Sequence, residues 1–286
     1  MTNKADLLKL HLSVILFGCA GLFAKLISNS ALYITAGRLF FAFISLFILA
    51  LLKGDRLKID RKSLGVLFIS GVILAVHWFS FFQSIKLLSV SIGLLLFTTY
   101  PVFTALIDRI VYRNRLQVSF ILVLGLNLTG LYFLTGAGDF DFSRADAYLY
   151  GILSGFSFAL LSFFNKHSLK KIKAETVNLY QFSFAFLIIF VFANRSLCSE
   201  FTTGSLILLI VLGVVFTALS HTLFVSSFKK LNLKSVAIIT CLEPVYGIIL
   251  AQILIGFDLD IKVGMGALLI ISAALFESLR EIKDQS

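Results

Sequence analysis

Two stretches of this sequence, FFQSIKLLSVSIGLLLFTTYPV (81–102) and FVSSFKKLNLKSVAIITCLEPV (224–245), align with each other at a constant offset. The alignment places Pro101 on Pro244, and these are the only two prolines in the chain. The offset equals half of the 286 residues. An internal repeat of this length indicates that the chain consists of two copies of one structural unit.

The composition is that of an integral membrane protein, with 59% hydrophobic and only 14% charged residues, against about 25% charged in soluble domains. Apolar stretches of about 20 residues can cross a hydrocarbon core of about 30 Å. Such stretches predict ten spanning helices, near 7–27, 33–52, 64–85, 90–111, 118–135, 147–164, 177–193, 205–228, 235–256 and 263–279. Little chain remains between them, so we expect one membrane domain, with a first repeat of about 7–136 and a second of about 147–280. The first helix has no convincing cleavage site, and we expect it to be retained.

Each repeat contains five predicted helices, and an odd number of spans reverses the orientation of the second copy relative to the first. Two such copies are related by a pseudo-two-fold axis in the membrane plane. Lys86 and Lys229 occupy equivalent repeat positions but fall on opposite sides of the predicted membrane, as this inversion requires. The predicted fold is therefore all-α, with ten transmembrane helices in two inverted five-helix repeats.

Basic residues are distributed unequally between the two sides. Most of the 25 Lys and Arg residues lie on the side of the N-terminus, while Lys25, Lys86, Arg144, Arg195 and Lys262 lie on the other. Because cytoplasmic loops accumulate positive charge, both termini are predicted to be cytoplasmic, in a cell inner membrane. This bias and contact with anionic lipid account for the net charge of +10, so no nucleic-acid partner is expected. The three cysteines fit neither a disulfide nor a metal pattern.

The prolines define candidate hinges. Pro101 and Pro244 each fall about eleven residues into the fourth helix of a repeat, which is near the bilayer centre. Each removes a backbone hydrogen bond and frees a carbonyl one turn earlier, that of Phe97 or Thr240, so the helix can bend there. The alternative is a kink that serves packing alone.

Glu243, directly before the second proline, is the leading candidate for substrate binding. A charge at membrane depth costs at least about 2.5–3.5 kcal/mol, so such residues usually face a cavity and mark a transport path. The alternative is a protonated Glu243 that hydrogen-bonds to a neighbouring helix. Arg38 lies near the external end of the second helix, where it either binds substrate or extends to the interface.

The remaining candidates are polar or aromatic residues at related depths. His221 occupies the repeat position of Trp78, Gln181 that of Arg38, and Tyr100 that of Glu243. The full predicted substrate-binding set is Glu243, Tyr100, Arg38, His77, Trp78, His221, Gln181, Tyr180 and Phe97. Ordinary core packing is the alternative for the histidines and for the aromatic members, Phe81 included.

Taken together, the residues resemble the drug/metabolite transporter superfamily, in particular its EamA-type ten-helix carriers. The resemblance rests on Phe17-Gly18 followed by Lys25, on Arg38, and on the segments YPVFTALI (100–107) and LEPVYGIIL (242–250). Family members often carry a Glu just after each proline-bearing helix, where this chain has Asn114 and Phe257. The resemblance implies a secondary carrier whose cavity is lined by the first four helices of each half, with substrates among amino acids, drugs, nucleotide sugars and S-adenosylmethionine.

A cavity with an acid, a guanidinium and several aromatic rings suits a zwitterion, so the expected substrate is an amino acid or related metabolite, exported or exchanged by alternating access. The alternative is uptake of S-adenosylmethionine or another nucleoside-type metabolite. A membrane enzyme that uses His77, His221 and Glu243 is disfavoured, because no metal, diphosphate or phosphate-loop motif is present. A passive channel is a further, disfavoured alternative, which transport that does not saturate and shows no counterflow would reveal. We expect no catalytic residues, metal or cofactor. Small residues at 125–130, 264 and 266 predict close helix packing in a monomer or a homodimer.

Overall fold

The computed structural model describes residues 3–54, 57–114, 117–135, 144–193, 203–255 and 261–283. These ranges do not include Arg195, Cys198 and Phe257, which the sequence places in loops on one side of the membrane. Within the described ranges, nine helical segments are long and apolar enough to cross a membrane, and the shorter apolar helix Val118–Leu134 supplies a tenth. The prediction of a ten-helix membrane protein is confirmed.

The spans begin and end within a few residues of their predicted positions, but four of them consist of more than one helical segment. In the first half they are α1 (Asn3–Ala20) with α2 (Phe23–Leu26), α3 (Ala31–Lys53), α4 (Arg61–Leu87), α5 (Val90–Phe97) with α6 (Tyr100–Tyr112), and α7 (Val118–Thr135). In the second half they are α8 (Ala145–Ser168), α9 (Ala174–Ala193), α11 (Thr203–Gly213) with the π-helical turn η2 (Val214–Leu219) and α12 (Ser220–Ser227), α13 (Leu233–Thr240) with α14 (Glu243–Ile255), and α15 (Ile261–Lys283).

Local sequence signals explain where the proline-bearing spans begin. The side chain of Ser89 accepts a hydrogen bond from the Ile92 N–H at the start of α5. Its repeat equivalent, Asn232, accepts one from the Ser235 N–H at the start of α13. Both residue types are favoured N-caps because their side-chain oxygen satisfies a backbone donor that the helix leaves free. The duplication is therefore visible in the capping chemistry as well as in the prolines.

Both proline-bearing spans are broken rather than kinked. The α5 helix ends at Phe97, and α6 restarts at Tyr100 with its proline in the first turn. In the second half, α13 ends at Thr240 and α14 restarts at Glu243. Proline is well tolerated in a first helical turn, where its missing N–H would have no intrahelical partner. The predicted hinge positions thus coincide with two-residue interruptions, which absorb a change of direction more easily than a continuous helix.

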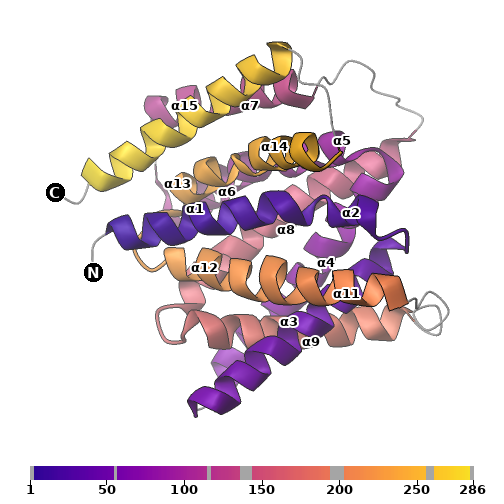
Figure 1. Cartoon of the computed structure of the whole chain (residues 1–286). Coiled ribbons are helices and arrows are strands. Elements are labelled where there is room, and N and C mark those ends of the chain that lie inside the picture. Colours follow the sequence, from indigo (N-terminus) through magenta and orange to yellow (C-terminus); the bar gives the residue numbers. More distant parts are fainter. Residues whose placement is uncertain are drawn as a thin grey trace.

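The packing of the helices follows the inverted repeat. Helix α1 packs against α12 and against α13 and α14, and its counterpart α8 packs against α4 and against α5 and α6. Helix α3 pairs with its own counterpart α9, and α7 pairs with α15. These two pairs occupy opposite edges of the bundle, and both termini lie at the same end (Figure 1). This arrangement confirms the predicted architecture of two inverted five-helix repeats.

Each break is covered by a glycine from the opposite half. A Cβ atom on Gly155 of α8 would lie 2.8 Å from the carbonyl oxygen of Phe97 and 3.2 Å from the Tyr100 nitrogen. A Cβ atom on Gly18 of α1 would lie 2.8 Å from the Glu243 carbonyl oxygen. Only a residue without a side chain permits this approach of one backbone to the other. The first helix of each half is therefore fitted directly to the interruption in the other half.

Candidate functional site

A central cavity of about 30 Å³ lies beside the two breaks. Its lining comes from both halves of the chain and comprises Phe17, Ala20, Arg38, His77, Trp78, Phe81, Phe97, Phe158, His221 and Glu243. None of these residues is more than 5% exposed. Little of the cavity lining is therefore accessible to solvent in this conformation.

Arg38 of α3 points into the protein. Its residue is 2% exposed, its Nε donates to the Thr217 hydroxyl at 3.0 Å, and its Nη2 lies 3.5 Å from the Phe216 carbonyl oxygen. The guanidinium carbon lies 4.0 Å from the centre of the Trp78 ring, a favourable cation–π distance. The alternative that Arg38 extends to the membrane interface is wrong, because its donors find protein partners inside the bundle.

The partners of Arg38 belong to the π-helical turn η2. The Ser220 N–H donates to the Val215 carbonyl, five residues earlier, instead of the Phe216 carbonyl four residues earlier. This leaves the Phe216 oxygen available to Arg38. The Thr217 hydroxyl in turn donates to the Leu212 carbonyl at 2.7 Å, so its lone pairs are oriented toward the guanidinium. Single π-helical turns within α-helices often occur at functional sites, and this one fixes the position of a buried cation.

Glu243 of α14 is the second charged residue in the cavity, and it is 5% exposed. In the described part of the chain, its carboxylate has no hydrogen-bond donor or ion-pair partner. Arg38 acts on it electrostatically without direct contact between the two groups. The alternative that Glu243 hydrogen-bonds to a neighbouring helix is therefore wrong for this conformation. An unsatisfied buried carboxylate is costly, and a ligand cation would offset that cost.

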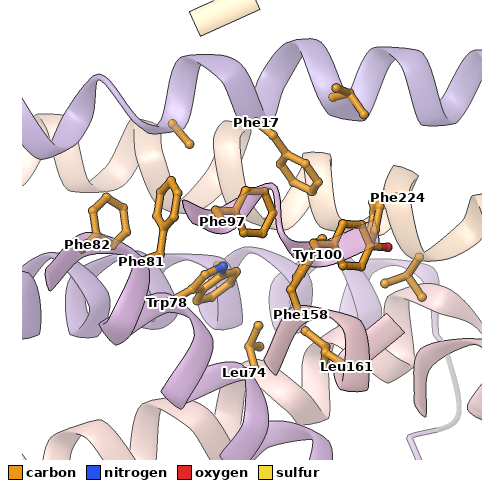
Figure 2. Packing of buried hydrophobic residues seen from close by; sticks show 14 of the residues in the cluster. Phe17, Leu74, Trp78, Phe81, Phe82, Phe97, Tyr100, Phe158, Leu161 and Phe224 are labelled. Atoms are coloured by element: carbon orange, nitrogen blue, oxygen red, sulfur yellow. The ribbon is translucent and has the colours of Figure 1, made fainter. Parts of the chain in front are cut away.

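Aromatic rings form most of the remaining wall. Phe158 of α8 lies at their centre, with its ring 4.7 Å from that of His77, 5.3 Å from Phe97 and 5.2 Å from Phe224. The rings of Phe17, Phe97, Tyr100 and Phe158 converge between the helices (Figure 2). The His77 ring is fixed by a 2.9 Å hydrogen bond between Nδ1 and the Ser154 carbonyl oxygen, which makes Nδ1 the protonated nitrogen.

A buried cavity that contains a basic and an acidic side chain lies at the junction of two inverted repeats, which is where alternating-access carriers place their substrate sites. Comparison with known sequences agrees with this, because the EamA-like transporter family profile matches the chain twice, at residues 6–136 and 146–279. The chain belongs to the EamA-like transporter family. The two matched segments correspond to the two halves of the structure.

Several EamA-like relatives are similar over nearly their whole length. An uncharacterized transporter of Archaeoglobus fulgidus is 27% identical over 92% of this chain and 93% of its own. The uncharacterized transporter YxxF of Bacillus subtilis is 21% identical over 94% and 88% of the two chains. The uncharacterized inner membrane transporter YicL of Salmonella typhimurium is 24% identical over 97% and 96%. A solved crystal structure, 17% identical, aligns over 100% of both chains with a TM-score of 0.82 and supports the fold.

Six of the nine predicted binding residues line the cavity of this EamA-like protein: Arg38, His77, Trp78, Phe97, His221 and Glu243. The other three lie outside it. The Tyr100 hydroxyl hydrogen-bonds to that of Ser162 at 3.1 Å, and Gln181 donates to the side-chain oxygen of Asn165 at 2.7 Å. The Tyr180 hydroxyl donates to the Leu57 carbonyl oxygen at 2.6 Å, near the end of the bundle. These three residues hold helices and loops in place around the site.

Sequence reasoning missed Phe17, Ala20 and Phe158, and it favoured core packing for Phe81. Phe17 stands in the Phe-Gly pair that carries the family resemblance, which was a usable signal. Phe158 follows Gly155 by three residues on α8, but one more phenylalanine among 31 gives no signal of its own. Its role depends on the tertiary packing that places α8 beside the break.

The cavity does bring His77, His221 and Glu243 together, as the enzyme alternative required. In the ranges that the structure describes, however, no group of three His, Cys, Asp or Glu side chains is arranged to hold a metal ion. The comparisons likewise match transporters.

Proposed function

We propose that this EamA-like transporter is a secondary carrier that moves a small zwitterionic metabolite, an amino acid or a close relative, across the cell inner membrane by alternating access. The observation that carries this proposal is that Arg38 and Glu243 line one buried cavity without forming an ion pair. Two opposite charges that are buried but unpaired suit a ligand that brings one charge of each sign. Its carboxylate would meet the Arg38 guanidinium, and its ammonium would meet the Glu243 carboxylate.

The aromatic wall supports an apolar or aromatic substrate side chain. The rings of Phe17, Phe81, Phe97 and Phe158 line the cavity. Such rings bury apolar ligand surface and also attract cations through their faces. The cavity has a volume of about 30 Å³, room for about two water molecules, so it would have to widen before it accepts even a substrate of amino-acid size.

The conformation supports the transport mechanism. Because every residue of the lining is almost fully buried, we interpret this conformation as an occluded intermediate. The breaks before Pro101 and Pro244 are the places where the second half-helices could tilt to open one end or the other. Since the repeats are inverted, equivalent motions in the two halves would open opposite faces. Export or exchange is the proposed mode.

A second candidate is uptake of S-adenosylmethionine, which one observation favours. A sulfonium is a cation that cannot donate a hydrogen bond, and the unpartnered Glu243 beside several aromatic faces would suit it. This substrate is much larger than an amino acid, so the cavity would have to enlarge before binding it.

Glu243 could also act as a proton carrier. A carboxylate that alternates between a proton and a substrate cation couples the two fluxes by competition. In that case Glu243→Gln would retain exchange of substrate but lose accumulation driven by a pH gradient. Simple charge recognition predicts that both activities fall together.

We further propose that both termini are cytoplasmic, in accordance with the distribution of Lys and Arg, and that the protein works as a monomer or a homodimer in contact with anionic lipid.

The test uses the full chain in proteoliposomes, with counterflow of radiolabelled amino acids, nucleosides and S-adenosylmethionine. The proposal predicts saturable counterflow of at least one zwitterion, and a loss of about tenfold or more for both Glu243→Gln and Arg38→Lys. Glu175→Gln, which makes the same chemical change at the start of α9 and outside the cavity, is the matched control. Unchanged transport of every zwitterion by Glu243→Gln would exclude charge recognition, and non-saturating flux without counterflow would indicate a channel.

A further inference from the structure

A second pocket lies at the end of the bundle that carries both termini, between the start of α4 and the end of α8. Its volume is about 200 Å³. Its lining comprises Lys62, Ser63, Val66, His167, Ser168, Lys170, Lys171 and Ile172. Among the residues that the structure describes, three lysines and a histidine contribute to this lining, and no carboxylate does. We propose that this pocket binds a phosphate-bearing anion, such as the headgroup of an anionic phospholipid.

The start of α4 contributes to the pocket in two ways. The first turn of this 27-residue helix supplies Lys62 and Ser63, and the N-terminus of a long helix carries partial positive charge. The nearby acid Asp60 is engaged with the helix itself, because its carboxylate accepts hydrogen bonds from the Ser63 N–H at 2.9 Å and the Ser63 hydroxyl at 2.7 Å. Lys171 lies near enough to Asp60 to interact with it electrostatically, but these two residues, both of which the structure describes, form no ion pair.

The end of α8 would normally repel an anion, because its last carbonyls carry partial negative charge. Here the turn that follows α8 donates hydrogen bonds to these carbonyls. The Ser168 carbonyl accepts hydrogen bonds from the N–H groups of both Lys171 and Ile172, and the Asn165 carbonyl accepts one from Leu169. These carbonyls are therefore satisfied by the turn, and the lysines Lys170 and Lys171 lie at the end of the helix in place of free carbonyl oxygens.

Ser168 supplies an observation independent of the charges. The residue borders the pocket and is 6% exposed, yet its hydroxyl has no hydrogen-bond partner. Most serine hydroxyls in the described helices donate to the carbonyl three or four residues earlier, as Ser70 and Ser157 do. A buried hydroxyl without a partner among the described residues is uncommon, and a small shift that turns it toward the pocket would let a phosphate oxygen accept from it.

The walls of the pocket are held in place before any ligand arrives. Leu57 and Ile59, ahead of α4, pack against the hydrophobic core, as do Leu169 and Ile172. The Tyr180 hydroxyl also fixes the Leu57 carbonyl. The apolar side chains of both connecting segments are thus directed inward, while Lys62, Lys170 and Lys171 are exposed at the ends of the spanning helices. With the termini on the cytoplasmic side, as proposed above, this is a basic pocket between spanning helices on the side where anionic headgroups are typically bound.

The experiment measures lipid binding by native mass spectrometry of the full-length protein in detergent, titrated with phosphatidylglycerol or phosphatidylcholine. We expect tighter binding of the anionic lipid, and about fivefold weaker binding for each lysine removed in Lys62→Gln and Lys170→Gln. Ser168→Ala should weaken binding by a few-fold without a loss of charge. Lys4→Gln combined with Lys229→Gln, at exposed positions outside the pocket, is the control that removes two charges from the same end.

A parallel arm adds inorganic phosphate to the protein in zwitterionic lipid nanodiscs and follows the melting temperature. If phosphate raises the melting temperature of the parent protein but not of Lys62→Gln/Lys170→Gln, the pocket also accepts the free anion. If only phosphatidylglycerol shows the lysine dependence, the lipid headgroup is the source. Two results would overturn the proposal. One is an equal loss of lipid binding in the pocket variants and in the Lys4/Lys229 control, and the other is the absence of a preference for phosphatidylglycerol over phosphatidylcholine.

Discussion

Replacing Thr217 by Val tests whether the π-helical turn positions Arg38 for substrate. Valine keeps the shape of the residue but removes the hydroxyl that accepts the 3.0 Å hydrogen bond from Arg38 Nε. Both residues are buried, with exposures of 0% and 2%, so water cannot easily replace the lost acceptor. A hydrogen bond to a charged group contributes about 1.5–3 kcal/mol.

The structure favours the lower end of that range. In Thr217→Val the guanidinium keeps its 4.0 Å contact with the Trp78 ring and its 3.5 Å contact with the Phe216 carbonyl oxygen. It should therefore stay in the cavity but be less strictly oriented. About 1.5 kcal/mol corresponds to roughly tenfold weaker substrate binding. The loss should be largest for substrates with a carboxylate and small for amides or esters of the same compounds.

The assay is equilibrium binding of the substrate identified by counterflow, together with the melting temperature of each variant. Thr35→Val is the matched control, because Thr35 is equally buried on the same helix as Arg38 but donates only to the Ala31 carbonyl at 2.7 Å. The assigned role of the turn would be refuted if Thr217→Val bound substrate within twofold of the parent protein. It would also be refuted if Thr217→Val and Thr35→Val lost equal amounts of substrate affinity.

Three further predictions concern packing and charge. Gly155→Ala should lower the melting temperature, because the added Cβ would lie 2.8 Å from the Phe97 carbonyl oxygen and such overpacking costs about 1–3 kcal/mol. Gly125→Ala is the control: its Cβ would meet no neighbouring atom within 4 Å, so its melting temperature should not fall. Asp108→Asn should lower the free energy of unfolding by about 1 kcal/mol, because it removes the 3.0 Å ion pair between Asp108 of α6 and Lys234. The double variant Asp108→Lys/Lys234→Asp, which reverses the pair, should recover part of this loss in thermal unfolding. Asp60→Ala should lower the melting temperature at neutral pH. The hydrogen bonds from Ser63 hold the pKa of Asp60 below its usual value, so this stabilisation is present above a pH of about 4, and the difference between variant and parent should shrink as the pH falls below that.

Much of the fold could be predicted because its main signals are local or periodic. Hydrophobic length gave the spans, and the offset between Pro101 and Pro244 gave the duplication and hence the inversion. The breaks at 98–99 and 241–242 were anticipated only as bends, because a proline predicts a lost hydrogen bond but not the length of the interruption. The π-helical turn in the eighth span has no proline to mark it and was not anticipated.

The charged residues of the site were predictable because burial of a charge in a membrane needs a reason, and both Arg38 and Glu243 line the cavity. Repeat equivalence was less reliable as a guide. It related Tyr100 and Gln181 to functional positions, but Tyr100 hydrogen-bonds to Ser162 of the opposite half and Gln181 to Asn165 of its own half. Two copies of a unit share a backbone plan, while the side chains at equivalent positions can diverge into structural roles.

The central claim is that the cavity around Arg38 and Glu243 opens to each face of the membrane in turn. The most direct measurement replaces the three native cysteines by alanine, introduces Ala20→Cys in the cavity wall, and adds a membrane-impermeant thiol reagent from one face or the other of oriented proteoliposomes. Leu268→Cys, at a residue that is 65% exposed on α15 and faces lipid, serves as the unreactive control. The account predicts that the cysteine at position 20 is labelled from both faces and protected by substrate, whereas labelling from one face only, or none from either, would contradict it.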